Sequence, residues 1–156
     1  MQTKGTIAVG GDHAGFEMKT EIVSFLKSEG YEVVDHGSYK KDDKDDYPDF
    51  VKKVARDVSR NPNKLKGIVF GGTGTGEAIV CNRFPSVRAV SYYGGNVEII
   101  SLSREHNDAN VLSLGARFVD LNESKAVIQK WLTIPFLNDE RHIRRLEKID
   151  NLYEDL

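Results

Sequence analysis

The chain has 156 residues, and its 22 basic and 24 acidic side chains leave a formal net charge of −2. This length suits one domain with a sizeable core, and the near-neutral charge lacks the basic excess typical of nucleic-acid-binding proteins. The single cysteine, Cys81, excludes an internal disulfide, disfavours a zinc site and fits a reducing compartment. No segment resembles a leader or a membrane span, so we expect one cytoplasmic domain over residues 1–156 with no nucleic-acid or membrane partner.

Apolar segments alternate with amphipathic ones along the chain. We predict short strands at 6–10, 31–35, 67–71, 87–93 and 110–115. Apolar residues at helical spacing predict helices carrying Met18, Ile22, Phe25 and Leu26, then Phe50, Val51, Val54 and Val58, then an inward-facing Val97, Ile100 and Leu102. Two more helices are predicted at 122–133 and 139–155. Strands alternating with helices predict an α/β fold, with a parallel sheet covered on both faces and ligands at the carboxyl ends of its strands.

The segment 68–83, "IVFGGTGTGEAIVCNR", places a glycine-rich loop between the third strand and a helix. Glycines admit a ligand close to the backbone, and amides at a helix N-terminus favour an oxyanion or a phosphate. Gly72, Gly74 and Gly76 miss the dinucleotide-binding pattern by one residue, and Glu77 stands where a P-loop has its lysine. The loop is therefore not a nucleotide fingerprint.

Glu77 has two interpretations from its position. An acidic residue in the first helical turn is mildly stabilising and needs no further function. Alternatively, Glu77 is a general base beside an amide-lined pocket, which is what enolisation of a sugar requires. Cys81, one helical turn further on, fits a buried small hydrophobe better than a nucleophile.

Polar residues also occur near the ends of other strands. Asp12 either caps the following helix or, with His13, handles sugar hydroxyls. His106 lies in the polar segment "SREHNDANV" and is a candidate for chemistry near neutral pH. In that segment Asp108 and Asn110 also suit a simple turn. We expect the charged run in "HGSYKKDDKDD", residues 36–46, to be solvated surface.

The C-terminal segment "DERHIRRLEK" places Arg141 and Arg145 four residues apart, on one face of the predicted helix. Two guanidinium groups on one face match a phosphate dianion. Arg144 has the favourable spacing for a solvated ion pair with Glu140, so this arginine needs no role in binding.

Taken together, these segments resemble the type B ribose-5-phosphate isomerase family, which includes the LacA and LacB subunits of galactose-6-phosphate isomerase. The resemblance covers nearly the whole chain and rests on "GGDHAGFEMK", "DYPDF", "GGTGTGEAI", "NRFPSVRAV", "SREHNDANVLSLGAR" and "RHIRRLEKI". It implies a Rossmann-like three-layer sandwich with a five-stranded parallel sheet. It also implies a homodimer with sites at the interface, in which aldose and ketose phosphates interconvert without metal or cofactor.

The family's site residues can be transferred one by one. The resemblance implies sugar contacts by Asp12 and His13, a pocket wall at Tyr47, and ring opening by His106 with help from Asn107. The loop amides, with the Thr73 hydroxyl, would hold the enediolate oxyanion. The phosphate would bind to Arg117, Arg141 and Arg145, some of them from the partner subunit. The loop residues implied in binding are Gly71, Gly72, Gly74, Thr75 and Gly76.

Many relatives carry a catalytic cysteine where this chain has Gly71. Another branch lacks that cysteine and uses a glutamate after the loop, which matches Glu77 here. The resemblance thus implies interconversion of ribose 5-phosphate and ribulose 5-phosphate, in the pentose phosphate pathway, with Glu77 as the base. The alternatives are a hexose 6-phosphate such as galactose or allose 6-phosphate as substrate, or a non-catalytic sugar-phosphate sensor.

Overall fold

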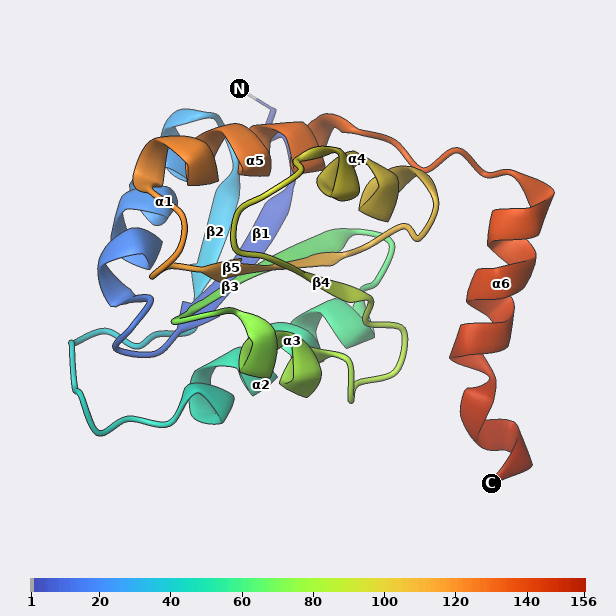
Figure 1. Ribbon diagram of the computed structural model, residues 1–156, viewed down its shortest axis with the longest axis horizontal. Helices are drawn as coiled ribbons and strands as arrows, with labels where there is room; N and C mark the ends of the chain where they lie inside the picture. Colours follow the sequence, from blue (N-terminus) through green and yellow to red (C-terminus); the bar gives the residue numbers. More distant parts are fainter. Residues whose placement is uncertain (1) are drawn as a thin grey trace.

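The computed structural model describes residues 2–156, apart from the side chain of Asp155. Five parallel strands form one sheet in the order β2-β1-β3-β5-β4 (Figure 1). They are β1 (Thr6–Gly11), β2 (Glu32–Asp35), β3 (Leu65–Gly71), β4 (Ala89–Tyr92) and β5 (Val111–Gly115). The helices are α1 (Phe16–Ser28), α2 (Tyr47–Arg60), α3 (Thr75–Cys81), α4 (Glu98–Glu105), α5 (Leu121–Thr133) and α6 (Glu140–Asp150).

Helices cover both faces of this sheet, because its strands are apolar on both sides. In Figure 1, α1, α4 and α5 lie on one face, and α2 and α3 lie on the other. The first face buries a cluster around Ile22, Phe70 and Trp131, and the second buries one around Val54, Val58 and Cys81. The Rossmann-like three-layer sandwich with five parallel strands is thus confirmed.

The order in which the strands are added changes side between β1 and β3. Strand β2 lies on one side of this pair, and β5 and β4 lie on the other. In open α/β sheets, ligands bind where the order reverses, beyond the carboxyl ends of the strands. Here that point lies between the loop after β1, which holds Asp12, and the loop after β3, which leads to Glu77. We call this side of the sheet the carboxyl edge and the opposite side the amino edge.

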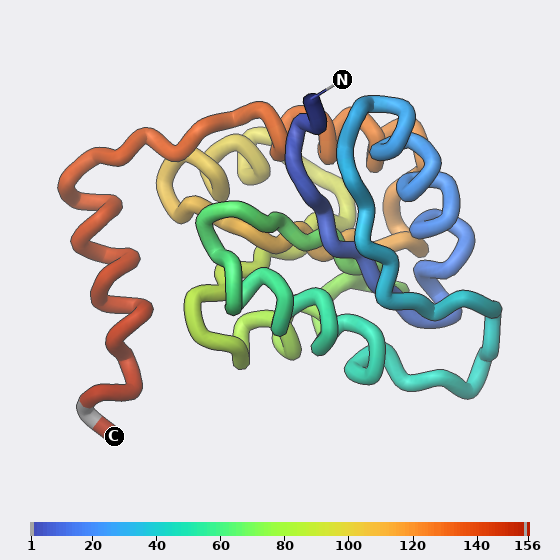
Figure 2. Tube along the Cα trace, turned by 180° about the vertical axis from the view of Figure 1, so that it is seen from behind, coloured from blue at the N-terminus to red at the C-terminus, as the bar shows by residue number. Residues whose placement is uncertain are grey.

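Helix α6 stands apart from the sandwich, at the end of an extended connection after α5 (Figures 1 and 2). Its contacts with the body include the stacking of His142 on His106 and an ion pair of 3.9 Å between Arg88 and Asp150. Leu146 is buried, whereas Ile143 and Ile149 are exposed. A helix with apolar residues left uncovered on its surface is typical of one that packs against another chain.

Two predictions about helices were wrong. The predicted helix 139–155 ends at Asp150, and a separate 3₁₀ turn follows at Leu152–Asp155. Of the three apolar residues predicted to face inward around α4, Ile100 is buried, whereas Val97 and Leu102 are 38% and 36% exposed. The spacing of apolar residues predicted which segments are helical, but it did not distinguish a residue that packs on the sheet from its neighbour on the solvent side.

Among residues 2–156, no helix is both long enough and apolar enough to cross a membrane.

Candidate active site

The loop between β3 and α3 approaches its neighbours closely. Gly74 has φ of 78°, which a side chain would strain, and its carbonyl oxygen accepts hydrogen bonds from the hydroxyls of Ser113 and Ser91. The Thr73 hydroxyl accepts a hydrogen bond of 3.2 Å from the amide of Thr75, so its own proton remains available for a ligand. The surrounding strands therefore hold the loop in a defined shape.

Side chains from other elements surround this loop. Tyr47, the first residue of α2, lies against Gly76: a Cβ built on Gly76 would be 2.6 Å from the phenolic oxygen. Arg117 lies against Gly72, where a built Cβ would be 3.2 Å from a guanidinium nitrogen. The structure thus brings Tyr47, Arg117 and the loop glycines to one place, as predicted.

Glu77 lies in the first turn of α3 and is only 4% exposed. Burial raises the pKa of its carboxyl above the ordinary value, and the nearby charge of Asp12 raises it further. A carboxylate with a pKa raised in this way is a better proton acceptor than a solvated one. A glutamate that only complemented the helix dipole would not need to be buried, so the environment favours the catalytic interpretation.

Asp12 and His13 follow β1 at the same edge. The Asp12 carboxylate accepts hydrogen bonds from the amides of Ala14 and Gly15, at 3.0 and 3.3 Å. Asp12 is not the N-cap of α1, which is Gly15, so it braces the turn before the helix. It is nevertheless 6% exposed and close enough to Glu77 to act on its pKa.

Asp45 belongs to the loop 36–46, which we expected to be solvated surface, and its carboxylate binds His13. One oxygen of Asp45 accepts hydrogen bonds from the His13 backbone amide at 3.1 Å and from ring Nδ1 at 2.6 Å. This bond raises the pKa of the His13 imidazole. The expectation was wrong for Asp45. It is one of seven charged residues at positions 40–46, and no local pattern distinguished it from the six others.

Asp12, His13 and Asp45 also have the residue types of a metal site, with one ligand atom from each within 4.8 Å of the others. The His13 and Asp45 atoms are, however, 2.6 Å apart. Two ligands at about 2.1 Å from a tetrahedral zinc ion would be about 3.4 Å apart. The close contact fits a shared proton better than a shared metal ion.

Cys81 is buried on the inner side of α3. Burial raises the pKa of its thiol to about 12, with a further contribution from Glu77. A thiol that stays protonated and lies in the core is neither a nucleophile nor a base at neutral pH. The interpretation of Cys81 as a small core residue is confirmed.

His106 lies at the other edge of the sheet. It follows α4 and lies before Val111, the residue at the amino end of β5. Gly71 pairs with Gly115, which is the residue at the carboxyl end of β5. The strand between these edges spans roughly 13 Å at about 3.3 Å per residue. The chain therefore does not bring His106 and its neighbour Asn107 to Glu77.

At the amino edge His106 stacks on His142, with 4.4 Å between ring centroids and 18° between the rings. His142 is 3% exposed, and burial lowers the pKa of its imidazole, as does the neighbouring His106. Asp108 adopts φ of 44° and binds Arg88 and Arg104. Its interpretation as a turn residue is confirmed.

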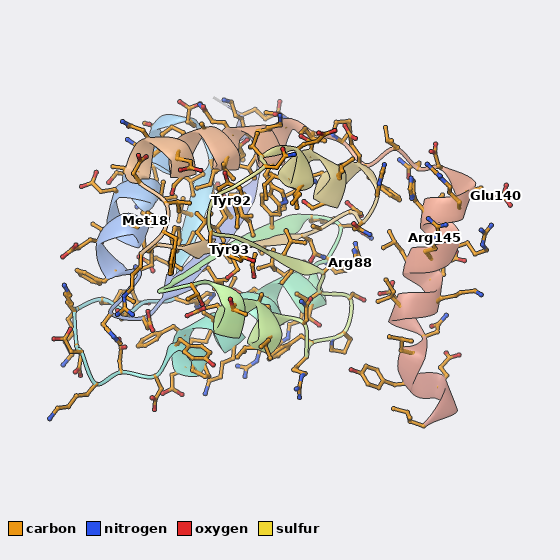
Figure 3. All side chains as sticks on the ribbon, viewed as in Figure 1. Met18, Arg88, Tyr92, Tyr93, Glu140 and Arg145 are labelled. Atoms are coloured by element: carbon orange, nitrogen blue, oxygen red, sulfur yellow. The ribbon has the colours of Figure 1, made fainter. Side chains whose placement is uncertain are left out.

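The two predicted phosphate-binding arginines of the C-terminal segment, Arg141 and Arg145, are exposed on α6. Figure 3 shows Arg145 beyond the Arg88 end of β4, on the side away from Tyr93, which follows the carboxyl end of that strand. Both arginines are thus separated from Arg117 and the loop. The chain by itself divides the predicted site into two parts, one at each edge of the sheet.

Comparisons with known proteins identify the family of the chain. A family model described as Ribose/Galactose Isomerase matches residues 7–149. The chain belongs to this family. Ribose-5-phosphate isomerase B of Escherichia coli K12 is 39% identical over 143 residues, covering 92% of this chain and 93% of the relative. Its counterpart in Mycolicibacterium paratuberculosis is 37% identical over 141 residues, covering 90% and 87%.

Solved structures of the family share the fold over almost the full length. Ribose-5-phosphate isomerase B of Mycoplasma genitalium, with ribulose 5-phosphate bound, superposes with a TM-score of 0.93 at 34% identity, covering 99% of this chain and 100% of that one. The enzyme from Clostridium thermocellum gives a TM-score of 0.88 at 41% identity, with coverage of 96% and 98%.

Proposed function

We propose that this isomerase interconverts ribose 5-phosphate and ribulose 5-phosphate, with Glu77 as the general base. Its similarity to ribose-5-phosphate isomerases B, one of them with ribulose 5-phosphate bound, supports the substrate. The observation that carries the role of Glu77 is its buried carboxylate, with a raised pKa, directly beside the glycine-rich loop. The reaction belongs to the pentose phosphate pathway, and we place the chain in the cytoplasm as a single isomerase domain over residues 1–156.

In the proposed reaction the sugar binds as a ring, and His106 assists its opening as a general acid, with Asn107 bonding a sugar oxygen. Glu77 then takes the proton from C2, and negative charge develops on the carbonyl oxygen at C1. The amides of the loop from Gly72 to Gly76, together with the Thr73 hydroxyl, stabilise this cis-enediolate. A proton passes from the C2 hydroxyl to the C1 oxygen, and the abstracted proton returns to C1, which leaves the carbonyl at C2. No electron leaves the substrate, so neither a redox cofactor nor a metal is required.

The separation of the two edges supports a homodimer with shared sites. Glu77, Asp12, His13 and Arg117 belong to one edge, and His106 belongs to the other. A two-fold dimer would bring the amino edge and α6 of one subunit to the carboxyl edge of its partner. The exposed arginines at 141 and 145 would then bind the phosphate in the partner's site, opposite Arg117. Two such dimers could pair into a tetramer through a separate surface.

The decisive experiment measures turnover of ribose 5-phosphate by the purified protein with a chelator present, beside the variant Glu77→Gln. We expect activity to survive chelation and kcat to fall by about 100- to 10,000-fold in the variant with KM changed little. Near-normal turnover by Glu77→Gln would exclude Glu77 as the base. An inactive wild-type protein would shift the question to galactose or allose 6-phosphate, and then to a sugar-phosphate sensor.

A further inference from the structure

Gly71, the last residue of β3, leaves open the space that the Glu77 carboxylate occupies. The three atoms nearest to a Cβ built at Gly71 are both carboxylate oxygens and the carboxyl carbon of Glu77, and all three would overlap it. The backbone at Gly71 is not in the left-handed region, so its conformation would accept any residue. Space, and not backbone freedom, is what requires glycine here.

The other glycines of the loop have different neighbours. A Cβ at Gly72 would meet the flexible end of Arg117, and one at Gly76 would meet the ring of Tyr47. Gly71 is the loop glycine whose space is filled by the carboxylate of the base. A substitution at this position therefore acts first on Glu77.

A side chain at position 71 would force the carboxylate to move by more than an ångström, since real Cβ atoms essentially never approach other atoms within 3.0 Å. Misplacing a catalytic group by about 1 Å can cost on the order of 100-fold in rate. The move would be confined, because Glu77 is buried and Asp12 lies close to it.

We propose that Gly71 is a positioning residue for proton abstraction: its missing side chain sets where the Glu77 carboxylate lies, so a base at 77 depends on glycine at 71. This inference rests on the proposed function of Glu77. It predicts that even one added methyl group at position 71 lowers the rate of the chemical step while the substrate still binds.

The test introduces Gly71→Ala into the wild-type protein and, as a matched control, into Glu77→Gln. In the first background we expect kcat for ribose 5-phosphate to fall by about 100-fold with KM within about threefold. In the second background the base is already lost, so the further fall should be less than about threefold. Equal losses in both backgrounds, or a nearly normal kcat for Gly71→Ala alone, would overturn the proposal.

A rescue experiment separates positioning from damage to the fold. Glu77→Asp retracts the carboxylate by one methylene, so it should lower kcat in the wild type but raise kcat when added to Gly71→Ala. If Gly71→Ala alone fails to fold, the double variant relieves the overlap and should fold and turn over; its failure would overturn the proposal. An inactive wild type would instead refute the proposed function, whatever the variants do.

Discussion

The two edges of the sheet differ in how complete they are within one chain. At the carboxyl edge, Glu77 is buried, Asp45 holds His13, and Tyr47 and Arg117 close on the loop. At the amino edge, His106 is stacked on His142, while Arg141 and Arg145 are exposed on a helix that stands away from the body. The first edge is preassembled by its own chain, whereas in the proposed dimer the groups of the second edge act on the substrate in the partner's site.

The largest expected effect comes from combining the two edges in one dimer. Glu77→Gln and His106→Asn should each be nearly inactive alone. When they are co-expressed, half of the dimers are mixed and each mixed dimer has one intact site, so activity should recover to about one quarter of wild type. Activity of the purified mixture measures this. No recovery would mean that Glu77 and His106 act from the same chain.

The arginines of α6 should have the next largest effect. Arg141→Ala and Arg145→Ala should each raise KM for ribose 5-phosphate by about 10- to 100-fold, because a charge-assisted contact with the phosphate is lost. Arg144→Ala, on the same helix, is the matched control and should leave KM unchanged. Steady-state kinetics decide this, and equal KM values for all three variants would contradict phosphate binding by the pair.

A smaller effect is expected at the preassembled edge from Asp45→Asn. Because Asp45 raises the pKa of His13, the imidazolium, which can donate from both ring nitrogens, persists to higher pH in the wild type. The variant should raise KM a few-fold and move the alkaline decline of kcat/KM to lower pH. A pH profile measures this shift. An unchanged alkaline limb would show that His13 does not act through its charge.

The smallest effect concerns stability. Burial raises the pKa of Glu77 in the folded protein above its value in the unfolded chain. The ionised carboxylate therefore destabilises the native state fully when the pH is above the pKa of the folded state. This effect disappears when the pH is below the pKa of the unfolded chain. Glu77→Gln should therefore raise the midpoint of thermal unfolding by a few degrees at pH 8 and by less at pH 4. The exposed Glu21, changed to glutamine, is the control and should change neither midpoint. A gain independent of pH would refute this account.

Much of the fold could be predicted from the sequence, because its signals are local. Each of the five predicted strands was found within two residues or so at each end, and α5 buries Val127, Ile128 and Trp131 as expected. The end of α6 and the exposure of Val97 and Leu102 were not predicted correctly. Those features depend on what covers a helix, and an apolar residue at helical spacing has the same pattern whether its cover comes from its own chain or from another.

For the candidate site, the sequence by itself determined the chemical groups: a glycine-rich loop, a carboxylate after it, and histidines and arginines in recognisable segments. Only the tertiary structure decided their distribution, with Glu77 and Asp12 at one edge and His106 with α6 at the other. It also decided the surroundings of Asp45 and Gly71: Asp45 contacts His13 across 32 residues, and Gly71 lies beside the buried carboxylate of Glu77. Spacing along a chain carries local geometry, whereas distances between strand ends arise only when the sheet is assembled.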